Sequence, residues 1–123
     1  MVYLREAHAA DSDWPMRVPD EEPINTHKSL ADRRAVATKC CKKLNIKIPC
    51  LIDDMENTTD KAYSAHPDRI FVVDKEGRIA VRAEPGPWGF EVGVRKVRRW
   101  LRAEFPKVEG SEGANETPSP EEG

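Results

Sequence analysis

Residues 62–90 read AYSAHPDRIFVVDKEGRIAVRAEPGPWGF, and this stretch decides the fold class. Ile70 to Val73 form a continuous run of β-forming apolar residues, and Ile79 to Val81 form a second run. Lys75-Glu76-Gly77 lies between them and supplies a short turn with its flexible residue last. The stretch therefore predicts two neighbouring antiparallel strands.

Prolines stand at both ends of this predicted hairpin. Pro67 directly precedes the first strand, and X-Pro bonds are cis at only about 5% of positions in folded proteins. Pro85-Gly86-Pro87-Trp88-Gly89 follows the second strand, where two prolines fix φ and two glycines permit close approach of the backbone. The pattern predicts a stiff loop that presents Trp88, either as a plug at the end of the core or as a substrate contact.

The other elements follow from apolar spacing and from capping residues. A helix is expected from His27 to Leu44, capped by Asn25 or Thr26. Its apolar face would carry Leu30, Ala37, Cys41 and Leu44. The remaining expected elements are, in chain order, a strand at residues 2–4, a surface loop at 9–23, a strand at 48–53, a short helix from about 58 to 63 and a final helix at 91–105.

Length and composition favour one small domain with a tail. The chain has 123 residues, of which 38% are hydrophobic and 34% are charged, so it can build a single small core. The domain is expected over residues 1–105, and residues 106–123, rich in Gly, Pro, Ser and Glu, are expected to be disordered. The formal net charge of -2 gives no global field for nucleic acid, and no run approaches the roughly 20 apolar residues of a membrane span.

The cysteines indicate a reducing compartment. There are three, an odd number without zinc-like spacing, which argues against a disulfide scaffold or a structural metal site. Cys40 and Cys41 are adjacent in the predicted helix and are poorly placed to bond to each other, because disulfide geometry is specific. They and Cys50 are expected to be small packed side chains. A cytoplasmic location is the default expectation, since the N-terminus lacks a signal-peptide pattern.

Several short motifs together resemble the iodothyronine deiodinase family over residues 1–101. They occur in the family's order and are Tyr3 to His8 (YLREAH), Asp13-Trp14, His27 with Leu30 to Arg33, Asp54 to Asn57, Ala62-Tyr63, Pro67 to Arg69 and Pro85 to Phe90. The resemblance implies a thioredoxin-like α/β fold with a peroxiredoxin-like insertion, in which the proline at position 67 is cis and faces the redox centre. It also implies reductive removal of iodine from iodothyronines by a selenocysteine or cysteine nucleophile, with a thiol reductant as co-substrate and no bound cofactor.

The resemblance also exposes a missing nucleophile. In the family, the first strand and the nucleophile that follows it would precede the strand that begins here at Val2. That strand would lie between the strands at residues 2–5 and 70–73, so its absence would leave two unpaired edges, which proteins normally avoid. The chain is therefore expected to be an N-terminally incomplete fragment, inactive by itself, with the nucleophile encoded upstream.

Five residues are candidates for a functional site. Glu6 and His8 lie two apart at the end of the first strand, so they are expected on one face of the sheet, where a carboxylate and an imidazole can relay a proton. The resemblance assigns the matching residues this role. It also implies that His27 and Arg69 hold the amino-acid end of an iodothyronine, with Trp88 on the substrate side. The alternatives are a His8 bonded to a backbone carbonyl and an Arg69 in a surface salt bridge.

Two other functions remain open at this point. One is a non-catalytic thioredoxin-like module that binds a partner and covers its open sheet edges as a homodimer. The other is a peroxiredoxin-like thiol peroxidase, because a fold does not fix the reaction. We prefer the deiodinase-like oxidoreductase, for which the expected partners are a small-molecule substrate and a thiol electron donor.

Overall fold

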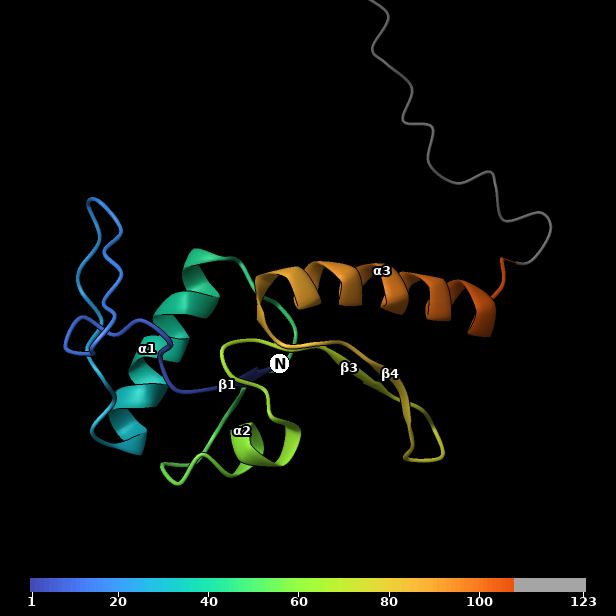
Figure 1. Cartoon of the computed structure of the whole chain (residues 1–123), viewed down its shortest axis with the longest axis horizontal. Helices are drawn as coiled ribbons and strands as arrows, with labels where there is room; N and C mark the ends of the chain where they lie inside the picture. Colours follow the sequence, from blue (N-terminus) through green and yellow to red (C-terminus); the bar gives the residue numbers. More distant parts are fainter. Residues whose placement is uncertain (108–123) are drawn as a thin grey trace, which may run out of the picture.

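The computed structural model describes residues 1–107, in which strands alternate with helices. The elements in chain order are β1 (Val2–Tyr3), α1 (Leu30–Lys43), β2 (Leu51–Ile52), α2 (Thr58–Tyr63), β3 (Phe71–Val73), β4 (Ile79–Arg82) and α3 (Gly86–Glu104) (Figure 1). This order confirms the α/β class. The predicted tail lies outside the described residues from residue 108 onward.

The strands form two separate pairs. β1 and β2 are parallel, with Val2 opposite Leu51, and α1 makes the crossover between them. β3 and β4 are antiparallel, with an irregularity between Val72 and Val73. Within residues 1–107, β1 and β3 are therefore each paired on one side only.

The β3–β4 hairpin confirms the prediction from the opening stretch. Gly77 has a φ of 80°, a conformation that side chains disfavour, which explains glycine at the end of the turn. The Asp74 carboxylate accepts the backbone N–H groups of Glu76 at 3.0 Å and Arg78 at 2.9 Å. This Asx-type bonding closes the turn without help from the rest of the chain.

Helix α1 begins later than expected. Its N-cap is Ser29, whose hydroxyl accepts the Asp32 backbone N–H at 3.1 Å, and not Asn25 or Thr26. Ala37 is buried on the predicted face, but Leu30 and Leu44 are largely exposed. The expected apolar face is therefore only partly correct.

The predicted stiff loop is instead the first turn of α3, so this expectation was wrong. Pro85 is the N-cap, and Pro87 occupies the first turn, where its missing N–H is not needed for helix bonding. Trp88 is 82% exposed and does not plug the described core. No described helix combines the length and apolarity of a membrane span.

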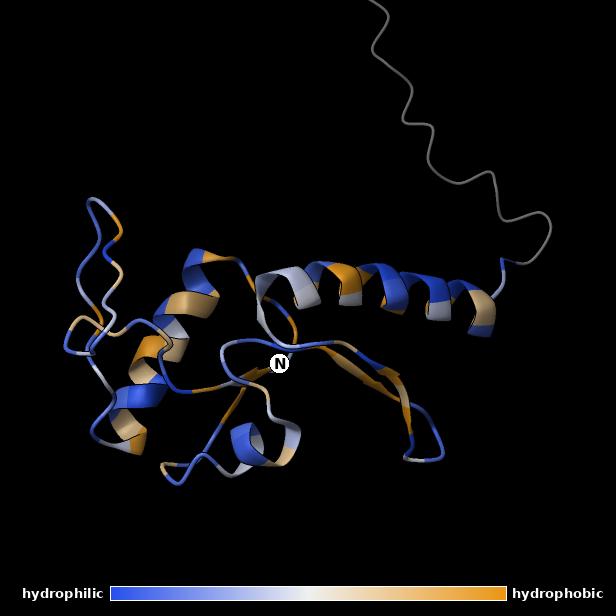
Figure 2. Ribbon diagram, in the orientation of Figure 1, coloured by the Kyte–Doolittle hydropathy of each residue, from blue (hydrophilic) through white to orange (hydrophobic). Residues whose placement is uncertain are grey.

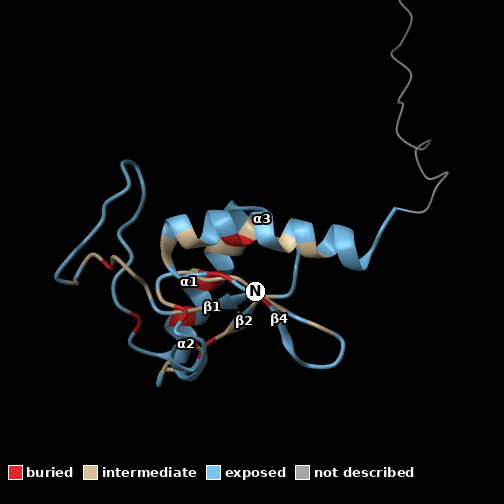
Figure 3. Ribbon diagram, turned by 45° about the vertical axis from the view of Figure 1, so that its right-hand side comes forward, coloured by how far each residue is buried: buried red, intermediate tan, exposed pale blue. Residues whose placement is uncertain are grey.

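The strands before α2 are also shorter than expected. β1 ends at Tyr3, and the strand expected at residues 48–53 is reduced to two residues, Leu51 and Ile52. The buried apolar side chains are few and small: Ala9, Ala37, Ala65, Val81 and Ala83. Figure 2 shows hydrophobic residues along β3 and β4, and Figure 3 shows that most of the ribbon is exposed. Apolar burial in the described part is therefore modest.

Helix α3 packs on the hairpin through Gly93. A Cβ at this position would lie 2.4 Å from Ile70 Cγ2 and 2.5 Å from the Ala83 Cβ. Ala83 is itself buried, so neither neighbour is the free end of a long side chain. The glycine is needed here for close approach of helix and sheet.

We expect Gly93→Ala to destabilise the chain by about 1 to 2 kcal/mol, because overpacking outweighs the gain in helix propensity. Urea unfolding followed by circular dichroism measures the change. Arg99→Ala, on an exposed position of the same helix, should change stability by less than about 0.5 kcal/mol. A Gly93→Ala protein as stable as the wild type would contradict the close packing.

Candidate functional site

A buried polar arrangement starts where β1 ends. The Tyr3 hydroxyl donates a hydrogen bond to Glu6 Oε1. Burial raises the pKa of Tyr3 well above its ordinary value, and the bond to Glu6 raises it further. Tyr3 therefore keeps its proton and acts as the donor, while Glu6 is the acceptor.

His27 extends this arrangement from the loop before α1. The residue is only 5% exposed, and its Nε2 lies 3.5 Å from Glu6 Oε1. Its Nδ1 accepts a hydrogen bond from Arg33 Nε at 3.0 Å. Because a guanidinium can only donate, Nδ1 carries the lone pair and the ring hydrogen sits on Nε2, facing Glu6. The Tyr3 hydroxyl is hydrogen-bonded to this carboxylate oxygen, whereas the His27 Nε2–H faces the same oxygen at 3.5 Å without forming a hydrogen bond.

The buried guanidinium of Arg33 donates hydrogen bonds to His27 and to three other acceptors. Arg33 is 3% exposed. Its Nη1 donates to the carbonyl oxygens of Asp53 at 3.1 Å and Asp54 at 2.6 Å, and its Nη2 donates to Asn57 Oδ1 at 3.2 Å. The side chain therefore joins α1 to the segment between β2 and α2 and fixes the imidazole of His27.

Asp53 anchors the start of α2. Its carboxylate accepts the backbone N–H groups of Thr59 at 2.9 Å and Asp60 at 3.0 Å. Burial opposes ionisation of Asp53, but these bonds outweigh it and hold its pKa below the ordinary value of 3.8. The neighbouring Asp60 pairs with Arg5 at 2.9 Å, which ties the end of β1 to α2.

His8 is held apart from Glu6 by different partners. Its Nδ1 lies 3.1 Å from the carbonyl oxygen of Trp14, and its ring meets the indole edge-on at 5.7 Å. Because a carbonyl only accepts, Nδ1 carries the hydrogen and neutral His8 keeps a lone pair on Nε2. β1 ends at Tyr3, one residue before the expected end of the strand, so Glu6 and His8 lie in the irregular segment that follows it. Their proton-handling role stays a prediction.

Arg69 contacts partners different from those of His27. Its Nε donates to the Ala83 carbonyl at 2.6 Å, and its Nη1 donates to the carbonyls of Tyr63 at 2.8 Å and Ser64 at 3.3 Å. The guanidinium carbon also lies 4.9 Å from the centre of the Phe71 ring. These bonds connect α2 to the hairpin, whereas a surface salt bridge had been the alternative.

A hollow lies between the end of β1 and the cis His66–Pro67 peptide bond. Its volume of about 530 Å³ is within the range of small-molecule sites. Burial lowers the pKa of His66, and the charge of Arg5 lowers it further. The residues that line the hollow are Arg5, Asn57, Asp60, Lys61, Ser64, His66 and Pro85. Residues 1–107 hold no group of three His, Cys, Asp or Glu side chains that could bind a metal ion.

Tyr3 and Arg33 were missed as site residues by the sequence reasoning. A signal for Arg33 was present, because it lies at helical spacing between Leu30 and Ala37 on the face assigned to the core. A long charged side chain on such a face needs several buried acceptors. Nothing in the sequence showed that those acceptors would come from residues 53–57.

The comparisons with known proteins point to one family. The family model for iodothyronine deiodinases matches residues 1–105. Type I iodothyronine deiodinase of Xenopus laevis is 34% identical over 91 residues, which cover 74% of this chain and 34% of that protein. Type II iodothyronine deiodinase of Aquarana catesbeiana is 29% identical over 109 residues, covering 87% of this chain and 40% of that protein. Thyroxine 5-deiodinase of Sparus aurata is 30% identical over 108 residues, which cover 82% of this chain and 36% of that protein.

The chain belongs to the iodothyronine deiodinase family. Its fold is accordingly the thioredoxin-like α/β fold of that family. The three relatives named above are all deiodinases by name, and none of them is a thiol peroxidase. The chain spans between 34% and 40% of the length of the three curated relatives named above.

We expect Arg33→Met to lower the free energy of unfolding by about 3 kcal/mol, because the buried acceptors lose their donor and each such loss costs roughly 1–3 kcal/mol. The free energy of unfolding of Arg33→Lys should lie between that of Arg33→Met and that of the wild type. A lysine can donate to fewer of the acceptors than an arginine can. Urea unfolding is the measurement. Arg34→Met, at the exposed neighbouring position, is the matched control. Equal losses for Arg33→Met and Arg34→Met would contradict the role of the guanidinium.

Acid should weaken the fold through Asp53. Because its pKa is lower in the folded chain, Asp53 stabilises the fold above the ordinary value of 3.8, and this contribution is lost as the pH falls through the folded pKa. We expect Asp53→Asn to have a lower Tm than the wild type at neutral pH. In acid, the Tm values of the two proteins should become similar. Thermal unfolding across this pH range tests it, with the exposed Asp13→Asn as control. A difference in Tm that does not change with pH would contradict the assignment.

Proposed function

We propose that this chain supplies the proton-handling and substrate-binding part of a reductive deiodinase that acts on iodothyronine-like aromatic molecules. The observation that carries the proposal is the convergence of Tyr3 and His27 on one oxygen of Glu6, in a chain of the deiodinase family. Glu6 directly follows Arg5, which lines the hollow beside the cis peptide bond. We place the substrate at this hollow, with Glu6, one residue along the chain, as the carboxylate that exchanges protons during the reaction.

The proposed reaction needs a proton at carbon. A thiolate or selenolate takes the iodine from the aromatic carbon, and that carbon gains a proton in its place. Two thiols then reduce the resulting sulfenyl or selenenyl iodide, so that one aryl iodide and two thiols yield the arene, one disulfide and hydrogen iodide. His8, with a free lone pair on Nε2 when neutral, is suited to pick up and deliver that proton. No bound cofactor is required.

We propose that the nucleophile comes from a segment outside the described residues. The three described thiols, Cys40, Cys41 and Cys50, belong to α1 and to the residue before β2. Within the described residues, β1 and β3 each keep an unpaired side. A strand between β1 and β3 would pair both edges and carry its nucleophile to the carboxyl end of β1, the usual position of sites in α/β proteins.

The substrate side of the proposal uses Trp88 and Arg69. Trp88 stands exposed on the first turn of α3 and offers an aromatic face for stacking on an iodinated ring. Arg69 is fixed by its carbonyl contacts between α2 and β4 and offers a cation for a carboxylate. His27 is buried and bonded to Arg33, so we assign it to the positioning of Glu6 and not to direct contact with the substrate.

The test is an iodide-release assay on the complete reading frame, including any codons that precede Met1, with thyroxine as substrate and dithiothreitol as reductant. We expect Glu6→Gln to lower kcat by about 100-fold or more, with a small change in KM, because the amide cannot exchange protons. Glu76→Gln, in the exposed hairpin turn, should leave the rate unchanged. Full activity of Glu6→Gln, or peroxide consumption without iodide release, would overturn the proposal.

A further inference from the structure

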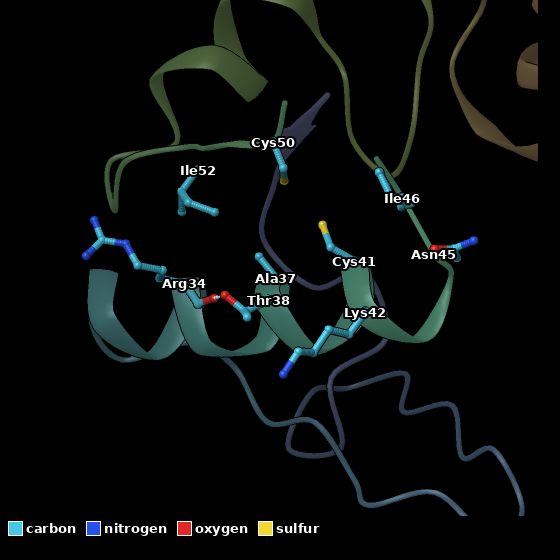
Figure 4. Close-up of a pocket in the computed structure, with 9 residues that line it drawn as sticks. All are labelled: Arg34, Ala37, Thr38, Cys41, Lys42, Asn45, Ile46, Cys50 and Ile52. Atoms are coloured by element: carbon cyan, nitrogen blue, oxygen red, sulfur yellow. Dashed lines mark hydrogen bonds between the residues drawn. The ribbon is translucent and has the colours of Figure 1, made fainter. Parts of the chain in front are cut away.

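Two cysteine side chains meet across the space between α1 and β2. Asn45, with a φ of 51°, ends the helical stretch, and the Ile46 N–H bonds back to the Cys41 carbonyl at 2.9 Å. The chain therefore reverses directly after α1 and brings Cys50 back over Cys41. Figure 4 shows the two sulfur atoms pointing toward each other from the helix and from the strand.

Both thiols line an open pocket of about 560 Å³. They are half-buried, so small reagents can reach them. Burial raises the pKa of Cys50, and the neighbouring Cys41 thiol raises it further. The sequence-based expectation of separate packed thiols did not foresee this pair.

We propose that Cys41 and Cys50 form a redox-active dithiol that exchanges electrons with an anionic low-molecular-weight disulfide of the glutathione type. The two side chains face each other from neighbouring elements, which is the arrangement from which an intramolecular disulfide can form. This site is separate from the Glu6 arrangement, and the proposal does not depend on deiodination.

The exchange proceeds in two balanced steps. The Cys41 thiolate attacks one sulfur of the disulfide, forming a mixed disulfide and releasing the first small thiol. The Cys50 thiolate then attacks the Cys41 sulfur, forming the Cys41–Cys50 disulfide and releasing the second. The dithiol loses two electrons to the small disulfide, and its two protons pass to the released thiols. We assign the second attack to Cys50, because burial and the neighbouring Cys41 thiol raise its pKa and so disfavour its thiolate.

The lining of the pocket indicates the charge of its ligand. The charged side chains among the lining residues are Arg34 and Lys42, both cations on the exposed side of α1. Thr38 and Asn45 add neutral polar groups. Such a rim favours a disulfide that carries carboxylates over a neutral one.

The test is incubation of the full chain with glutathione disulfide, followed by mass spectrometry and thiol titration. We expect the titratable thiols to fall from three to one and the mass to fall by two hydrogen atoms, with peptide mapping locating a Cys41–Cys50 bond. Cys40→Ser should form the same bond. Cys41→Ser and Cys50→Ser should instead stop at a glutathione adduct.

Two further experiments distinguish a reaction that depends on the folded pocket from the unspecific reaction of any exposed thiol. In denaturant, we expect adducts on the cysteines in place of the Cys41–Cys50 bond. The double variant Arg34→Gln, Lys42→Gln should react about tenfold more slowly with glutathione disulfide, but at an unchanged rate with neutral hydroxyethyl disulfide. A disulfide that involves Cys40, or glutathione adducts on all three cysteines of the folded chain, would overturn the proposal.

Discussion

The buried guanidinium of Arg33 is the interaction on which the rest of this structure depends. It ties α1 to the segment between β2 and α2, and in the same step it fixes His27 beside Glu6. A charge in such a position is tolerated only when its donors are satisfied, and here four acceptors surround it. The apolar side chains that are fully covered are mostly alanines, so polar contacts carry an unusual share of the specificity.

Asp53 connects the Arg33 contacts to α2. Its carboxylate holds the first N–H groups of that helix, while its backbone carbonyl accepts from Arg33. Asp60, in the same helix, pairs with Arg5 at the end of β1. One connected set of polar groups therefore positions the Glu6 arrangement and the hollow beside the cis peptide bond.

Helix α1 carries residues of two separate candidate sites. Its first turns carry Arg33, which orients His27 beside Glu6, and its last turns carry Cys41, which faces Cys50. Eight residues separate these positions, about 12 Å along a helix.

The sequence by itself determined the hairpin, the α/β class and the family, because each rests on contiguous patterns such as the run at Ile70 to Val73 with its glycine turn. It did not show that α3 begins at Gly86 or that Trp88 is exposed, since a proline-rich segment suits either a loop or a first helical turn. The partners of Arg33 and the meeting of Cys41 with Cys50 were decided only by the tertiary structure. Those contacts join residues on different elements, and their distance is set by how α1 packs on β2, which no local pattern encodes.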